Sequence, residues 1–369
     1  MARRNNFLPF LLASATGALT VATAIQYRKH RTANLKALAE GSMVIETALG
    51  PVEVGIAGKG DPVLVIHGIL GSYQQGLVVG EPLVDAGYRV ISPSRFGYVR
   101  SPLPENGSPA AQADVFAALL DVLKIKQAVV IGVSAGGPSA AEFAIRHPER
   151  TRALIMMAAV SQPRDTDAEE QHTQAMSMLL FGYTNDIALW LMLHYAIRTI
   201  PFSAAERPTL QNLIDRPALM SMYERLLWGL WPAANRRAGA NNDIVQIKRL
   251  KLSLKKISAP TVVLHGTADQ LVPFETGLYT ASQIPGAKFL RFEGGEHGLS
   301  ILQHDDVWPP LIEFIASTKK SAPKRAAKAT TKPAEPKKPA PATKPTERKN
   351  PTRARVRKPA ASTTRRPAQ

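Results

Sequence analysis

The sequence predicts an α/β fold, in which a mostly parallel sheet of eight strands is flanked by helices. Short, continuous apolar runs alternate along the chain with longer segments whose apolar residues recur at helical spacing. Strands that are buried on both faces have such continuous runs, so the alternation favours a sheet that helices cover on both sides. The predicted strands span residues 43–48, 52–56, 62–66, 89–92, 128–131, 153–160, 261–265 and 288–292.

A hairpin opens the predicted sheet, and helices connect most of the strands that follow it. Gly50 and Pro51 separate the first two strands and mark a tight turn. Ser108 followed by Pro109 is a helix start signal, and His147-Pro148 is a stop signal. The predicted helices span residues 77–86, 108–123, the segment from Gly137 to this stop signal, and 307–316.

A long insertion at residues 161–258 interrupts the alternation and divides the predicted core into residues 41–160 and 259–317. The insertion has several helical stretches rich in Leu, Met and Trp. Because it follows the carboxyl end of a strand, we expect a helical cap over that edge of the sheet. An apolar cap favours a substrate with an apolar body. Its tryptophans are candidate substrate-binding residues, with packing between cap helices as the alternative role: Trp190, Trp228 and Trp231.

The positive charge of the chain is concentrated at its two ends. The formal net charge is +17, yet residues 319–369 hold most of the excess, with only Glu335 and Glu347 as acidic residues. The body between the ends is slightly acidic, which excludes a basic nucleic-acid-binding fold as the main interpretation. The chain contains no cysteine, which excludes disulfides, thiolate metal sites and cysteine nucleophiles.

Both ends are predicted to lie outside the globular body. Residues 1–31 predict a single N-terminal membrane anchor, because no charged residue occurs from Asn5 to Tyr27 and basic residues flank that stretch. The alternatives are a secretory signal cleaved near Ala22-Thr23-Ala24, and a soluble amphipathic or disordered leader. The tail at 318–369 is rich in Lys, Ala and Pro and predicts disorder. Its charge suits contact with a polyanion such as anionic lipid or nucleic acid. We therefore expect a membrane-associated protein.

Ser134 is the candidate nucleophile. It stands in AVVIGVSAGG, residues 128–137, where an apolar strand, a tight turn and the start of a helix follow one another. Glycine two residues to either side permits a strained turn that pushes the hydroxyl out of the strand end. The helix N-terminus then directs free N–H groups at the same place. A glycine-rich turn with an incidental serine is the alternative.

A serine nucleophile needs a base and an acid that orients the base. Of the eight histidines, His297 lies in the loop after the last predicted strand, from which it can reach the carboxyl edge of the sheet. Asp269 follows the strand at 261–265 on the same edge, and lies between the serine and the histidine in the chain. The backbone N–H groups of Ile69 and Ala135 are the candidate donors to a developing oxyanion.

The order Ser…Asp…His, with HG-x-x-G upstream at 67–71, resembles the α/β-hydrolase superfamily in its branch with a helical cap. The resemblance covers residues 43–317, and the loop at 94–101 is also similar to that branch. Val133 stands where many relatives have His or another polar residue, and Ser94 replaces a more usual acidic residue, so the substrate subclass stays open. The resemblance implies a serine hydrolase of esterase or lipase type, without a metal or an organic cofactor.

Other activities are alternatives to ester hydrolysis. Within the superfamily they are hydrolysis of a carbon–carbon bond in a dienone-type acid and a cofactor-free haloperoxidase activity. A serine at position 134 argues against the dehalogenase and epoxide hydrolase members, whose nucleophile is an aspartate. An alternative from another class is a non-enzymatic scaffold whose basic tail binds a polyanion.

Overall fold

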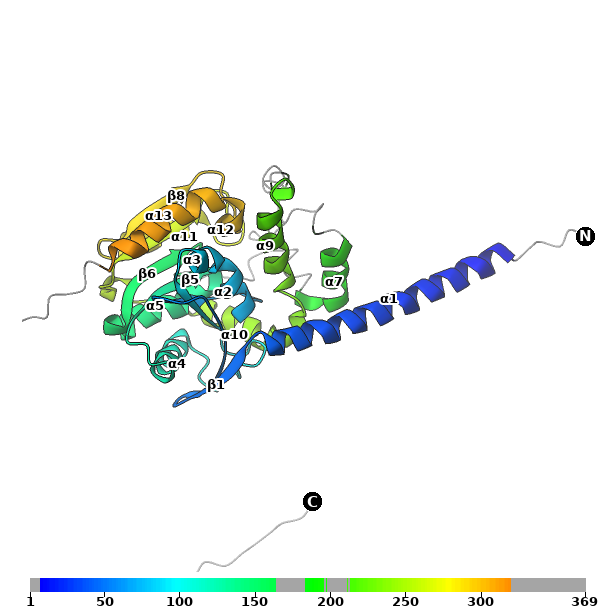
Figure 1. Cartoon of the computed structure of the whole chain (residues 1–369), viewed down its shortest axis with the longest axis horizontal. Helices are drawn as coiled ribbons and strands as arrows, with labels where there is room; N and C mark the ends of the chain where they lie inside the picture. The colour runs from blue at the N-terminus through cyan, green and yellow to red at the C-terminus, as the bar shows by residue number, and fades with distance from the viewer. Residues whose placement is uncertain (1–6, 164–182, 196, 198–210, 212, 320–369) are drawn as a thin grey trace, which may run out of the picture. The chain divides into compact units, whose positions relative to one another are not determined.

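The computed structural model describes residues 7–163, 183–195, 197, 211 and 213–319, and within them it contains one eight-stranded sheet (Figure 1). The strand order is β1-β2-β4-β3-β5-β6-β7-β8. The pairs β1·β2 and β2·β4 are antiparallel, and the remaining pairs are parallel. The predicted fold class is therefore confirmed. The strands are β1 (Met43–Thr47), β2 (Gly50–Ala57), β3 (Pro62–Ile66), β4 (Arg89–Pro93), β5 (Ala128–Val133), β6 (Thr151–Met157), β7 (Thr261–Gly266) and β8 (Lys288–Phe292).

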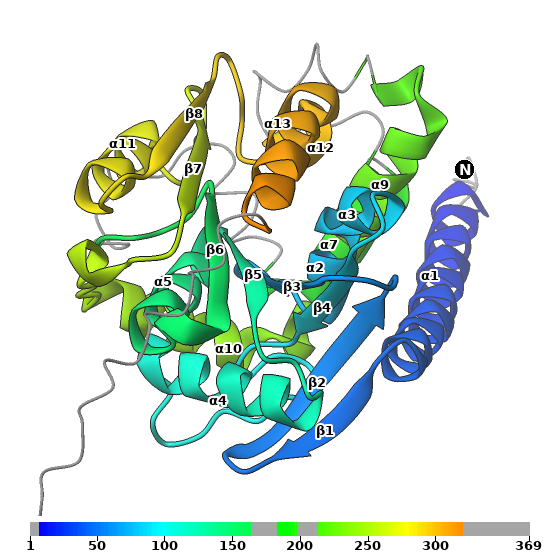
Figure 2. The same ribbon diagram turned by 60° about the vertical axis from the view of Figure 1, so that its left-hand side comes forward.

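Alternate residues of each central strand enter two separate apolar cores. In β3, Leu64 and Ile66 belong to the core on one face, whereas Val63 and Val65 belong to the core on the other. Helices α4 (Pro109–Val122) and α5 (Gly137–Arg146) cover the first face, and α3 (Glu81–Asp85) and α13 (His304–Ser317) cover the second (Figure 2). This burial on both faces is the reason that the strands appear as continuous apolar runs in the sequence.

Two predicted elements differ from the structure in their bounds. The predicted helix at 77–86 is two helices, α2 (Tyr73–Val79) and α3, separated by Gly80. A Cβ on Gly80 would lie 2.8 Å from a Val90 methyl group, so the chain packs tightly on β4 at this break. Strand β6 ends at Met157 rather than at residue 160. The reason is that Ala158 adopts a φ of 44°, after which the Val160 N–H donates to the Ser134 carbonyl.

Three helices are described in the predicted cap: α7 (Asp186–Tyr195), α9 (Pro217–Trp228) and α10 (Arg237–Lys248). They share one apolar core with the segment after β3 and with α2 and α12 (Leu299–Leu302). Leu70, Val78 and Ile301 are the buried residues that these core segments contribute. The cap boundaries at 161 and 258 stay a prediction.

The predicted membrane anchor is wrong, and with it the predicted membrane association. Residues Phe7–Glu40 form one helix, α1, and no helix in the described ranges combines the length and apolarity that crossing a bilayer requires. The uncharged stretch is only mildly apolar because Ala and Thr dominate it, and the helix continues into charged residues at 28–40. Near its C-terminal end α1 packs on the body: Leu38 is buried, and the Tyr73 hydroxyl donates to its carbonyl at 2.8 Å. The predicted tail at 318–369 lies almost entirely outside the described residues.

Candidate active site

Ser134 lies on a strained turn between β5 and α5. Its φ is +51°, a left-handed conformation that non-glycine residues rarely adopt. A short 3₁₀ turn, η1 (Ser134–Gly136), leads directly into α5. A Cβ on Gly132 would lie 2.5 Å from the Ala140 methyl group, and one on Gly136 would lie 2.3 Å from the Ile66 carbonyl oxygen. Only glycine fits at either position, which is the physical reason for the spacing seen in the sequence.

Asp269 and His297 form a hydrogen-bonded pair. The carboxylate of Asp269 is fully buried, and His297 Nδ1 lies 2.8 Å from its Oδ2. The backbone N–H groups of Leu271 and Val272 both donate to Oδ1 at 2.9 Å. Burial opposes ionisation of this carboxyl, but His297 and His265 outweigh that effect and hold the pKa of Asp269 far below its usual range. The acid is therefore an anion at neutral pH, as an orienting group requires.

His265 is a second histidine on the same carboxylate, and sequence reasoning set it aside as a residue at a strand end. Its Nε2 lies 3.2 Å from Asp269 Oδ2 and 2.9 Å from the Val272 carbonyl oxygen, and its side chain is fully buried. The spacing of four residues between His265 and Asp269 was the available signal. The chain turns after the end of β7, and this turn brings the Asp269 carboxylate next to the His265 ring.

The segment after β3 lies directly beside the serine. A Cβ on Gly68 would lie 3.0 Å from the Ser134 Cβ and 3.5 Å from its Oγ. Because β3, β5 and β7 are parallel members of one sheet, their carboxyl ends bring Gly68, Ser134 and Asp269 to the same edge. The candidate oxyanion donors therefore adjoin the serine: Ile69 follows Gly68, and Ala135 is buried at the start of η1.

Arg95 is a buried cation at this edge that sequence reasoning missed. Its guanidinium donates to both carboxylate oxygens of Asp243 on α10, with Nη1 at 2.7 Å from Oδ1. The Tyr98 hydroxyl also donates to Asp243. Burial opposes the charge on Arg95, but Asp243 and Tyr98 outweigh it and raise the pKa of the guanidinium. This cluster joins the cap to the core. Motif patterns do not reveal it, because its two charges are far apart in sequence.

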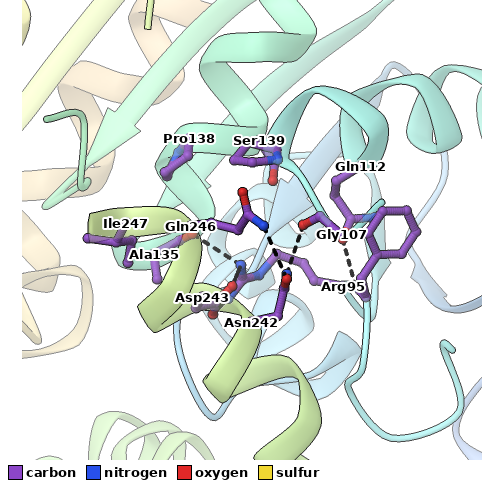
Figure 3. Close-up of a pocket in the computed structure, with 12 residues that line it drawn as sticks. Arg95, Gly107, Gln112, Ala135, Pro138, Ser139, Asn242, Asp243, Gln246 and Ile247 are labelled. Atoms are coloured by element: carbon purple, nitrogen blue, oxygen red, sulfur yellow. Dashed lines mark hydrogen bonds and ion pairs between the residues drawn. The ribbon is translucent and has the colours of Figure 1, made fainter. Parts of the chain in front are cut away.

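A small pocket of about 20 Å³ lies next to this cluster, between α10 and the start of α5 (Figure 3). Asn242 and Gln246 line it from the cap, and Ser139 lines it from the core. Within the ranges that the structure describes, no group of three or more His, Asp or Glu side chains is arranged to hold a metal ion.

Glu53 on β2 supplies the carboxylate that the sequence lacks at position 94. It is fully buried and accepts hydrogen bonds from the Ser94 hydroxyl at 2.7 Å and from Arg100 Nε at 2.8 Å. The Ser42 hydroxyl donates to it as well, at 2.8 Å. The serine at 94 thus contacts a buried acid from the neighbouring strand.

The three candidate substrate-binding tryptophans belong to an aromatic cluster that includes two residues of α1. We define this cluster by its members: Tyr27, His30, Trp190, Trp228 and Trp231. The indole N–H of Trp190 donates to His30 Nδ1 at 2.8 Å, and that of Trp231 donates to the Asp186 carbonyl at 3.1 Å. These contacts fit the packing role, and contact with a substrate stays a prediction.

Comparisons with known proteins agree with the fold. Residues 61–303 match the family model of the alpha/beta hydrolase fold. A solved alpha/beta hydrolase fold protein from Nakamurella multipartita is 30% identical with a TM-score of 0.65, and the match covers 75% of this chain and 98% of that one. The 2-hydroxymuconate semialdehyde hydrolase of Pseudomonas putida is 27% identical over 70% of this chain and 88% of its own length. The bifunctional esterase/perhydrolase DCH of Acinetobacter calcoaceticus is 26% identical over 63% and 83%, respectively. The chain therefore belongs to the alpha/beta hydrolase family and is a hydrolytic enzyme.

Proposed function

We propose that the enzyme is a serine hydrolase that cleaves esters with an apolar acyl or alcohol part, using Ser134, His297 and Asp269. One observation carries the proposal. A serine on a strained strand-to-helix turn stands at the same sheet edge as a histidine that is hydrogen-bonded to a buried, ionised aspartate. Such a combination suits nucleophilic catalysis at an acyl carbon, where the nucleophile, base and orienting acid act as a unit.

The proposed reaction proceeds in two halves. In the first, Ser134 Oγ attacks the ester carbonyl while Nε2 of His297 takes the hydroxyl proton, and the tetrahedral oxyanion accepts hydrogen bonds from Ile69 and Ala135 N–H. His297 then returns the proton to the departing alcohol, which leaves an acyl-enzyme. In the second half, water loses a proton to the same nitrogen and attacks the acyl carbon. The bond from Ser134 Oγ to the acyl carbon then breaks, His297 returns the proton to Oγ, and the carboxylic acid leaves. Each oxyanion donor is worth about 10²–10³ in rate.

The apolar core of the cap supports an apolar substrate, since Leu, Met and Trp side chains dominate it. Alternatives within the family draw support from the relatives. Hydrolysis of a ring-cleavage product is favoured by the likeness to 2-hydroxymuconate semialdehyde hydrolase, and perhydrolase chemistry by the likeness to the bifunctional esterase/perhydrolase. Haloperoxidase chemistry is favoured by a 28% identical relative, a putative non-heme haloperoxidase of Mycobacterium phage D29. All these activities use the same serine, so the substrate distinguishes them.

The test is hydrolysis of 4-nitrophenyl esters from acetate to long acyl chains by the wild type and by Ser134→Ala, with fluorophosphonate labelling of both. We expect turnover and labelling of the wild type, and loss of both in the variant. The chain length that gives the highest kcat/KM then reports the depth of the acyl pocket. Labelling at Ser134 without cleavage of any ester would contradict the ester proposal and favour the ring-cleavage alternative. Absence of labelling in the wild type would contradict the serine mechanism itself.

A further inference from the structure

The guanidinium of Arg95 contacts the backbone on both sides of the candidate oxyanion site. Its Nη1 donates to the Ala135 carbonyl oxygen and its Nη2 to the Gly68 carbonyl oxygen, each at 3.1 Å. The same two nitrogens hold the two carboxylate oxygens of Asp243. Arg95 is only 4% exposed, so these contacts are made away from water, where charge-assisted hydrogen bonds are strong.

The contact with Gly68 fixes the direction of a catalytic donor. In a trans peptide the C=O and the following N–H point in opposite directions. The peptide between Gly68 and Ile69 is trans, because the cis bond found in the described residues is elsewhere, at Trp231-Pro232. When Arg95 holds the Gly68 oxygen on its own side, the Ile69 N–H is therefore turned to the opposite side. A Cβ on Gly68 would lie 3.0 Å from the Ser134 Cβ, so this peptide is next to the reacting serine.

The neighbouring histidine makes the same peptide plane more rigid. The Arg95 backbone N–H donates to His67 Nε2 at 2.9 Å, which leaves the ring proton on Nδ1, 2.8 Å from the Gly68 oxygen. Burial, followed by the charge of Arg95, lowers the pKa of His67 well below its usual value, so the ring stays neutral and keeps this tautomer. The Gly68 oxygen thus accepts three hydrogen bonds. The Gly71 N–H donates to it at 3.3 Å within the loop, and the other two depend on Arg95, one through its guanidinium and one through its backbone N–H and His67.

Asp243 ties this arrangement to the cap. It lies on α10, and its carboxylate is the acidic partner of the Arg95 guanidinium. Helix α10 itself approaches the loop after β4 closely: the Gly239 N–H donates to the Gly97 carbonyl at 3.0 Å, and a Cβ on Gly97 would lie 2.6 Å from the Gly239 nitrogen. The position of α10 therefore determines where the carboxylate holds Arg95.

We propose that Arg95 is a positioning residue that orients the Gly68–Ile69 peptide for oxyanion binding, and that Asp243 makes this orientation depend on the seating of the cap helix α10. The proposal deepens the proposed function and rests on it. Loss of the carboxylate, or of the planar guanidinium, leaves Ser134, His297 and Asp269 in place but lets the Ile69 N–H turn away from the oxyanion. The chemical step then becomes slower, while the affinity for the ground-state ester does not change.

The first arm of the test is kinetic and compares Arg95→Lys and Asp243→Asn with the wild type on a matched oxygen ester and thionoester. Lysine keeps the charge but cannot make four directed hydrogen bonds. We expect kcat to fall about 10- to 100-fold in Arg95→Lys and by a smaller factor in Asp243→Asn. These losses are smaller than the loss caused by removing one oxyanion donor completely. The KM should change less than threefold in both variants. The preference for the oxygen ester over the thionoester should shrink by a similar factor, because a sulfur anion gains less from the N–H donors.

The matched control is Arg146→Lys. Arg146 makes a similar two-point contact with Asp114, with Nε at 2.9 Å from Oδ1 and Nη2 at 2.6 Å from Oδ2, but on the outer side of α5. We expect this variant to keep the kcat and the ester-to-thionoester preference of the wild type. A loss of kcat in Arg95→Lys without a change in that preference would overturn the proposal, since a merely structural role produces that pattern.

The second arm does not require turnover. In protein labelled with ¹⁵N-isoleucine, the Ile69 amide resonance should shift in both Arg95→Lys and Asp243→Asn and stay in place in Arg146→Lys. An unmoved Ile69 resonance in Asp243→Asn, with the thermal midpoint showing a folded protein, would overturn the coupling to the cap. If the wild type cleaves no ester but the resonance shifts as expected, the proposed function fails and the positioning role stands. If Arg95→Lys does not fold, both the kinetic and the resonance measurements are made on the isosteric Asp243→Asn.

Discussion

The most informative residue of the site is Asp269, whose environment stabilises a charge in the protein interior. Two backbone N–H groups and two histidines surround a carboxylate that has no exposed surface. An ionised group without such partners would be costly to bury, by several kcal/mol even after relaxation. A depressed carboxyl pKa means that the stabilising interactions are present at neutral pH and are lost only as the pH falls through that low pKa. We therefore expect no loss of activity from protonation of Asp269 in mildly acidic solution.

Replacement of this acid tests its catalytic role. Asp269→Asn has nearly the same shape but presents a neutral amide, which neither fixes the tautomer of His297 nor stabilises an imidazolium. We expect kcat to fall about 10³–10⁴-fold with little change in KM. Steady-state kinetics on the best 4-nitrophenyl ester checks this. Asp114→Asn, which removes a partner of Arg146 at a distance from the site, is the control and should keep kcat. A loss of less than tenfold in Asp269→Asn would show that the aspartate does not orient the base.

At the scale of elements, the unexpected feature is the contact between α1 and the cap. His30 is half-buried against Trp228 and Trp231, with ring centroids 4.8 and 5.4 Å away, and its Nδ1 accepts the indole proton of Trp190. Burial, and then the nearby His194, lower the pKa of His30. A protonated His30 carries hydrogens on both ring nitrogens and cannot accept that bond. The docking of α1 on the cap therefore requires the neutral ring.

This requirement predicts a pH dependence with a definite sign. Because the docked state binds the proton less tightly than the free helix, docking is complete above the ordinary histidine pKa of about 6.5 and weakens as the pH falls below it. Hydrogen exchange of the amides at 25–33, corrected for intrinsic rates, should accelerate between pH 7.5 and 5.5. His30→Phe keeps a ring in the cluster but cannot titrate, and its exchange should not respond to pH in this range. A response that survives in His30→Phe would assign the effect to another group, with His194 the first to test.

At the scale of the whole molecule, the sheet and the site differ in how far the sequence reveals them. The central strands β3 to β7 were predictable because each is buried on two faces and therefore forms a continuous apolar run, whereas the edge strands β1 and β8 are partly exposed. Ser134, Asp269 and His297 could be predicted as candidates because each follows a strand end, where side chains meet at one edge. The Arg95–Asp243 pair joins residues from the core and the cap, and only the folded chain brings them together.

Helix α1 is an element whose environment could not be predicted from the sequence. Its lack of charge from Asn5 to Tyr27 suggested a lipid environment, because an uncharged stretch of sequence does not say which apolar surface it meets. The structure places Tyr27 and His30 against the tryptophans of the cap instead. Those same tryptophans were interpreted as a substrate surface, and this contact gives them a packing partner. It does not account for the uncharged stretch itself, whose Val21 and Ile25 side chains are exposed.

The final prediction concerns what this contact contributes to the stability of the molecule. Deletion of residues 2–31 removes Tyr27 and His30 from the aromatic cluster, with the loss of edge-to-face ring contacts worth about 1 kcal/mol each and one hydrogen bond worth about 1 kcal/mol. For a body of this size we expect the thermal midpoint to fall by about 5–10 °C. Tryptophan emission should shift to longer wavelength as the cluster becomes hydrated. The double variant Val21→Ser, Ile25→Ser is the control, since these side chains are 59% and 62% exposed and should leave the midpoint unchanged. An unchanged midpoint in the deletion would mean that α1 contributes nothing to the stability of the cap.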